Sequence, residues 1–229
     1  MKVAIVHYHL EPGGVTKVIE NTLLAWEKSA LPIQAVALSG RPYQGKVIPH
    51  TQVVEGLDYA TPEESIAPDI LAQRLKDAAK ESLGSSPDLW HIHNHSLGKN
   101  PALTAAVRLL AEQGEYLLLH PHDFAEDGRP QNFLSLSEVY RHSYPTSERI
   151  RYAVLNHRDK SFLQKLTQNS ESEVHLLANA IPLEEAPRPS APTHSTLPEN
   201  LYLYPVRAVR RKNLRELALL SAAYPEKHF

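Results

Sequence analysis

The amino terminus of the chain places a short apolar run, a glycine turn and an amphipathic segment in direct succession. Residues 3–6 are apolar and rich in β-branched side chains, which is typical of a strand buried on both faces of a parallel sheet. A loop with Gly13 and Gly14 follows, and apolar residues then recur at helical spacing over residues 15–26. Since such a helix has to pack back on its sheet, this opening favours an α/β fold.

Apolar runs and helical segments continue to alternate along the chain. We expect a weak strand at 47–54, where Pro49 interrupts the run. The alternation predicts a Rossmann-like parallel sheet with helices on both faces. The other expected strands are 33–38, 89–93, 116–119, 151–155 and 174–177, and the other expected helices are 69–83, 102–112 and 158–166.

A change of composition divides the chain near residue 184. Residues 184–200 hold four prolines among Ser, Thr and Ala, which predicts an extended linker. Only a strand at 201–204 and a helix at 213–223 are expected after it, too little for a separate core. The predicted domains are a Rossmann-like domain over 1–183, the linker over 184–200, and the start of a truncated second domain over 201–229.

Composition excludes several classes of protein. The 229 residues include no cysteine, so disulfides and thiolate metal sites are excluded. The formal net charge of −2 argues against nucleic acid as a partner. No run approaches the roughly 20 apolar residues of a membrane span. We expect a cytoplasmic protein and leave peripheral membrane contact open.

Histidines gather at the ends of two expected strands. His91, His93 and His95 alternate and share one face if their strand stays regular. The next strand ends in His120, with His122 and Asp123 directly after it. Three interpretations stay open: a zinc site, loop and core histidines with backbone partners, and hydrogen bonds to a polyhydroxylated ligand.

Two segments have the chemistry of anion sites. The Gly13–Gly14 pair is either a tight turn or a close approach to a ligand at a helix start, and the dinucleotide pattern G-x-G-x-x-G is absent. A second segment, from Arg207 to Lys212, holds four cations between the expected strand and helix. It is either a diphosphate site or a solvated loop.

Five segments of the chain follow one another in a recognisable order: Pro12-Gly13-Gly14-Val15, Asp88-Leu89-Trp90-His91-Ile92-His93-Asn94-His95, His122-Asp123, Asn179-Ala180-Ile181-Pro182, and Val206-Arg207 with Lys212-Asn213. Taken in order, these segments resemble retaining GT-B glycosyltransferases of the family 4 type that use nucleotide-sugar donors. Ala180 and Val206 stand where that family usually has glycine.

The resemblance implies a hexosyl transfer from a nucleotide-sugar donor, as co-substrate, to a carbohydrate or other small-molecule acceptor. It implies no metal and no cofactor. In that family the second domain supplies most nucleotide contacts, so we expect the isolated 229-residue chain to be inactive. The implied residues are His122 and Asp123 for catalysis, Gly13, Gly14, Arg207 and Lys212 for the donor diphosphate, and His93, His95 and Asn179 for the acceptor or sugar.

Two alternatives come from other classes of protein. The first is a non-catalytic Rossmann-like module that binds a sugar or a phosphorylated metabolite. The second is a metal-dependent hydrolase. Its metal site would be built from His91, His93, His95, His122 and Asp123.

Overall fold

The computed structural model describes residues 1–168, 174–181, 198, 200–206 and 212–229. The chain divides into two compact units, Met1–Pro182 and Leu183–Phe229. None of the described helices is long and apolar enough to cross a membrane.

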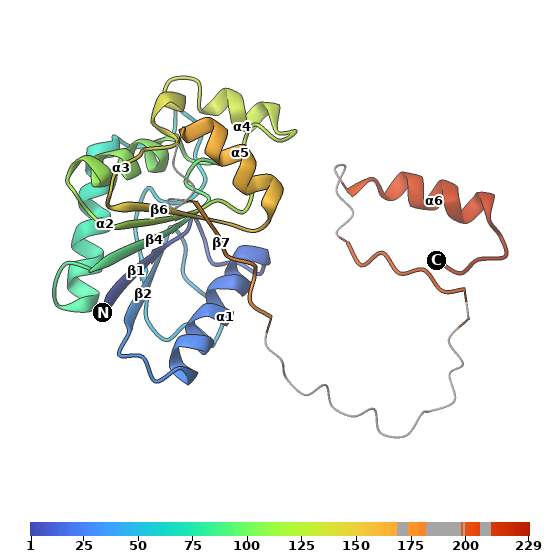
Figure 1. The fold of residues 1–229 in the computed structure, drawn as a ribbon, viewed down its shortest axis with the longest axis horizontal. Coiled ribbons are helices and arrows are strands. Elements are labelled where there is room, and N and C mark those ends of the chain that lie inside the picture. The colour runs from blue at the N-terminus through green and yellow to red at the C-terminus, as the bar shows by residue number, and fades with distance from the viewer. Residues whose placement is uncertain (169–173, 182–197, 199, 207–211) are drawn as a thin grey trace. The chain divides into compact units, whose positions relative to one another are not determined.

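Unit 1 is built on a seven-stranded sheet in which every pair of neighbours is parallel (Figure 1). The strand order is β3-β2-β1-β4-β5-β6-β7, which confirms the predicted Rossmann-like α/β sheet. The direction of winding reverses between β1 and β4, and ligands of such sheets bind outside the carboxyl ends at this point. The strands are β1 (Lys2–Val6), β2 (Gln34–Ser39), β3 (Thr51–Val53), β4 (Leu89–His93), β5 (Leu117–His120), β6 (Ile150–Val154) and β7 (Val174–Leu176).

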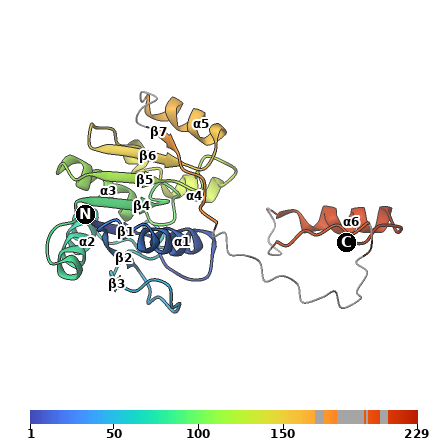
Figure 2. The ribbon, with the colours of Figure 1, turned by 60° about the horizontal axis from the view of Figure 1, so that its bottom comes forward.

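Helices cover both faces of this sheet (Figures 1 and 2). On one face, Ile19 of α1 (Gly14–Lys28) packs with Val3 and Ile5 of β1. The opposite core joins Trp90 and Ile92 of β4 with three helices. These are α2 (Pro68–Leu83), α3 (Pro101–Glu112) and α5 (His157–Thr167).

Local signals explain where the helices begin and end. Asn100 caps α3, because its side chain accepts a hydrogen bond from the Leu103 amide at 3.2 Å. Pro101 then occupies a first-turn position, where a missing N–H costs nothing. Gly84 ends α2 with a left-handed φ of 72°, which glycine adopts without strain.

Two short elements between β5 and β6 were not predicted. They are α4 (Pro130–Ser135) and the 3-10 helix η1 (Tyr140–His142). Neither contains a buried residue, so neither has the apolar periodicity by which a helix is recognised.

Unit 2 contains the helix α6 (Leu214–Ala223), in which no residue is buried. The predicted strand at 201–204 is wrong, because only an isolated bridge joins Leu201 to His228. Leu203 is 76% exposed, and two extended segments without a buried face do not form a stable sheet. Most of the predicted linker lies outside the described residues.

Candidate functional site at the carboxyl edge of the sheet

Polar side chains meet at the carboxyl ends of β1, β4 and β5, beside the point where the winding reverses. His7 follows β1, His91 and His93 lie in β4, His120 ends β5 and His122 comes two residues later. We call these five residues the histidine edge. Alternation along β4 places His91 and His93 on the sheet face opposite to Trp90 and Ile92.

The histidine edge is held together by two pairs of imidazoles. His93 and His120 are in register on neighbouring strands. Nε2 of His91 lies 3.2 Å from Nδ1 of His120, and Nδ1 of His93 lies 2.9 Å from Nε2 of His122. His91, His93 and His120 are at most 3% exposed, whereas His122 is half-buried. The only ring of these four that is open to a ligand is therefore that of His122.

His95 does not join this cluster, so the expectation that it shares a face with His91 and His93 is wrong. The strand ends at His93, and Asn94 turns the chain with a left-handed φ of 55°. Nε2 of His95 donates to the Ser143 carbonyl at 2.7 Å, and its own carbonyl accepts from the Thr104 hydroxyl at 2.6 Å. His95 is thus a buried residue with backbone partners and is 0% exposed.

Asn94 connects the three strand ends. Its Oδ1 accepts from the amides of His122 at 2.7 Å and Asp123 at 3.2 Å. Its carbonyl accepts from the Tyr8 hydroxyl at 2.6 Å, and its amide donates to the His120 carbonyl at 3.2 Å. The sequence interpretation missed this role, although asparagine tolerates the left-handed region better than most residues.

Asp123 is held by a neighbour that the sequence interpretation also missed. Nη2 of Arg129 lies 2.5 Å from Oδ1 of Asp123, and Nη1 of Arg129 donates to the Phe124 carbonyl at 3.0 Å. The side chain of Asp123 is 43% exposed. It can therefore accept further hydrogen bonds while the arginine fixes its position.

Burial keeps the histidine edge uncharged. It lowers the pKa of His122 to about 4, against a smaller opposing effect of Asp123. It also lowers the pKa of His91 to about 4, of His7 to about 3 and of His120 to about 2, with help from neighbouring imidazoles. A neutral imidazole donates one hydrogen bond and accepts another, so the edge is suited to hydroxyl groups more than to bare anions.

The glycine pair lies at the start of α1, and nothing in the fold requires glycine there. Gly13 has an extended backbone with φ of −177°, and a Cβ at Gly14 would meet nothing within 4 Å. Both residues are exposed. The fold therefore does not require glycine at either position, and the assignment of the pair to a ligand stays a prediction.

A hollow of about 300 Å³, which we call the edge pocket, is lined by residues of the loops after β3 and β4 and by residues of α4. The ring of Tyr59 lies 4.8 Å from that of His9, and Nζ of Lys99 lies 5.3 Å from the Tyr59 ring centroid. The lining combines a ring, a cation, a carboxylate, amides and hydroxyls. Its residues are Tyr59, Ala60, Thr61, Glu64, Gly98, Lys99, Gln131, Asn132 and Ser135.

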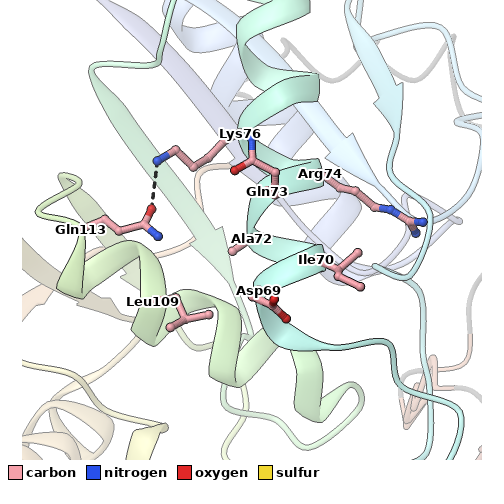
Figure 3. A pocket seen from close by; sticks show the side chains of 8 residues that line it. All are labelled: Asp69, Ile70, Ala72, Gln73, Arg74, Lys76, Leu109 and Gln113. Carbon is pink, nitrogen blue, oxygen red and sulfur yellow. Dashed lines mark hydrogen bonds between the residues drawn. The ribbon is translucent and has the colours of Figure 1, made fainter.

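A larger hollow, of about 470 Å³, lies between α2 and α3 on the outer surface of those helices (Figure 3). We call it the helix groove. Lys76 donates to Oε1 of Gln113 across it at 2.9 Å. Its lining residues are Asp69, Ile70, Ala72, Gln73, Arg74, Lys76, Leu109 and Gln113.

The remaining predicted site residues lie elsewhere. Asn179 is exposed, and the next residue, Ala180, accepts a hydrogen bond from Asn21 of α1 at 2.7 Å. Lys212 belongs to unit 2, where its carbonyl accepts from the Tyr204 hydroxyl at 3.0 Å. Arg207 lies outside the described residues.

Comparison with known proteins gives one relevant relative. The chain is 28% identical over 260 aligned residues to mannosylglucosyl-3-phosphoglycerate synthase of Petrotoga mobilis. The similarity covers 96% of this chain and 48% of the relative, so the chain spans about half the length of that protein. No protein-family model matches the chain. The chain is thus a distant homologue of a glycosyltransferase.

Proposed function

We propose that this chain provides the acceptor side of a retaining GT-B glycosyltransferase, which transfers a hexosyl unit from a nucleotide sugar to a phosphorylated sugar acceptor. One observation carries the proposal. In a distant homologue of a glycosyltransferase, a neutral, half-buried His122 follows β5 at the carboxyl edge of the sheet, where His93 and Asn94 hold it.

His122 and Asp123 are the proposed catalytic residues. His93 holds one nitrogen of His122 at 2.9 Å, and Asn94 fixes its backbone. A ring positioned in this way orients a hydroxyl of the transferring sugar or of the acceptor. Asp123, fixed by Arg129, accepts from a second hydroxyl of the same ligand.

The edge pocket is the proposed acceptor site. The face of Tyr59 offers an apolar surface to a sugar ring, while Lys99 offers an ammonium to a phosphate. The name of the relative describes a product with sugar units and a 3-phosphoglycerate unit. We extend this chemistry to the present chain as an acceptor with both a sugar and an anionic group.

The donor diphosphate is assigned to the amides after Gly13 and Gly14. The resemblance also assigns Lys212 of unit 2 and Arg207, which lies outside the described residues, to the diphosphate. Helix amides and cationic side chains stabilise the charge that develops as the nucleotide leaves. In this arrangement they take the place of a metal ion, so the proposed transfer needs no metal and no cofactor. Asn179 is assigned to the sugar.

Nuclear magnetic resonance of the isolated chain tests the acceptor assignment with glucosyl-3-phosphoglycerate as the probe. We expect the probe to shift the amide signals of Tyr59, Lys99 and His122. Lys99→Ala and His122→Ala should each weaken binding about tenfold, equivalent to about 1.4 kcal/mol. The exposed His50 and Lys80 provide matched alanine controls, and equal losses in those controls would contradict the assignment.

Donor binding is tested separately by calorimetry with common nucleotide sugars. We expect weak donor binding and no detectable transfer by the chain alone, because the chain spans about half the length of its glycosyltransferase relative. Micromolar donor affinity, or steady sugar transfer by the isolated chain, would contradict this expectation.

The two alternatives make different demands. The metal-dependent hydrolase loses two of its five proposed ligands, since His95 faces Ser143 and Asp123 is paired with Arg129. A non-catalytic sugar-binding module would use the same edge pocket. Transfer assays on a protein that joins this chain to a donor-binding domain distinguish the two. The proposed enzyme would lose sugar transfer on His122→Ala, whereas a module would transfer no sugar with or without the substitution.

A further inference from the structure

We propose that His91, His93 and His120 bind one divalent transition-metal ion of the zinc type, which joins β4 to β5 beneath the carboxyl edge. The ion is structural. It is separate from the proposed sugar transfer, whose chemistry does not need it.

The three imidazoles are already gathered. One nitrogen of each lies within 4.8 Å of the corresponding nitrogens of the other two. Tetrahedral zinc with bonds of about 2.0–2.1 Å to histidine places its ligand nitrogens about 3.3 Å apart. Small rotations of the three side chains therefore close the set around one ion, and the sheet need not move because His93 and His120 are in register on neighbouring strands.

His120 has an unmet hydrogen-bonding requirement. Its Nδ1 is bonded to His91, but its Nε2 is buried without a hydrogen-bond partner among the described residues. Buried polar atoms normally have partners, and those without one call for an explanation. Coordination of an ion would satisfy this nitrogen if Nε2 is the atom of His120 that binds it.

The surroundings favour a borderline cation over a hard one. The ligands are neutral imidazoles, which suit zinc, copper and nickel, whereas magnesium and calcium prefer oxygen. The one carboxylate that follows His122 is directed to Arg129. Three protein ligands leave the fourth position of a tetrahedral ion to a water molecule, and at most 3% of each ligand residue is exposed.

Metal content and cobalt absorption test the inference on the tag-free chain. After incubation with Zn²⁺ and removal of excess metal, we expect about one zinc per chain. Co²⁺ should give the visible absorption of a tetrahedral site. His120→Ala should reduce bound zinc at least tenfold. His95→Ala is the matched control, because His95 is equally buried and also has an unpartnered nitrogen but lies outside the cluster, and it should keep the ion.

Three results would overturn the inference: a wild-type chain that retains no zinc, an octahedral cobalt spectrum, or equal loss of metal in the two variants. If His120→Ala does not fold, the wild-type protein still decides, because its melting temperature must rise with Zn²⁺ and fall with a chelator. None of these measurements involves a sugar, so failure here is distinguishable from failure of the proposed transfer.

Discussion

The histidine edge and the helix groove differ in what surrounds their polar groups. In the edge, four of the five histidines are at most 5% exposed, their imidazoles form two hydrogen-bonded pairs, and the backbone amide of His122 donates to Asn94. In the larger groove, Lys76 and Gln113 meet at the surface. Burial of polar groups costs free energy that a solvated groove does not. Buried, mutually hydrogen-bonded imidazoles at the ends of strands are therefore a stronger reason to propose a site than the volume of a hollow.

The largest effect is expected from acid, because buried histidines make the stability of the fold depend on pH and the helix groove has no histidine in its lining. Burial lowers the pKa of His7 to about 3 and of His91, His95 and His122 to about 4. An unfolded histidine has a pKa near 6.5, so the unfolded chain takes up protons first. The stability contribution is complete above pH 6.5 and is lost as the pH falls toward the folded values.

Each of these four histidines lowers the free energy of unfolding by up to about 1.4 kcal/mol for every pH unit below pH 6.5. Their sum approaches the roughly 5–15 kcal/mol of a typical domain, so we expect unfolding near pH 5. Circular dichroism with a chelator present, so that no ion competes with protons, measures it. Stability that stays level down to pH 4 would contradict the neutral, buried state of the edge.

The next largest effect is expected from Asn94→Ala. The change leaves the amides of His122 and Asp123 without their acceptor and puts alanine at φ of 55°. An unsatisfied buried group costs about 1–3 kcal/mol and the left-handed backbone about 1–2 kcal/mol. The two amides and the backbone together give about 3–8 kcal/mol, and since both hydrogen bonds are only part-buried we expect a loss at the lower end, about 3–5 kcal/mol, in chemical denaturation.

Two variants at the same position separate these causes. Asn94→Gly removes the acceptor but relieves the backbone, and Asn94→Asp keeps an acceptor. The loss of stability should decrease from alanine to glycine to aspartate. Equal losses for alanine and aspartate would show that Oδ1 does not hold the His122 turn.

Substitution of Gly98, with Gly84 as its control, tests how closely α4 packs against the wall of the edge pocket. Gly98 and Gly84 share φ of 72°, but a Cβ at Gly98 would lie 2.0 Å from the Asn132 carbonyl oxygen, whereas one at Gly84 would meet nothing within 4 Å. We expect Gly84→Ala to cost about 1 kcal/mol and Gly98→Ala about 2–4 kcal/mol. Denaturation midpoints compare them, and similar losses would mean that α4 does not pack on Gly98.

Sequence alone predicted the sheet better than the site. The runs that became β1, β4 and β5 are apolar because parallel strands are buried on both faces, and this signal is local. The displacement of His95 was not predictable, because it depends on the left-handed turn at Asn94. The partner of Asp123 was missed for a related reason, since Arg129 reaches it through the fold of a loop. The prediction of a strand at 201–204 was wrong because a strand needs a neighbouring strand to pair with, and the local sequence does not show whether one is present.

Lys76→Ala in the helix groove should have the smallest effect. Nζ of Lys76 lies 2.9 Å from Gln113 and 3.4 Å from Glu115, and its side chain is 33% exposed. Surface contacts of this kind contribute about 0–1 kcal/mol.

Glu115, the acidic partner of Lys76, has a second role, because its Oε2 accepts from the indole of Trp90 at 3.2 Å. Glu115→Ala should therefore cost more than Lys76→Ala, about 1–3 kcal/mol, and neither should alter acceptor shifts at His122. A loss of those shifts in Lys76→Ala would make the groove part of the site and end the distinction between the two regions.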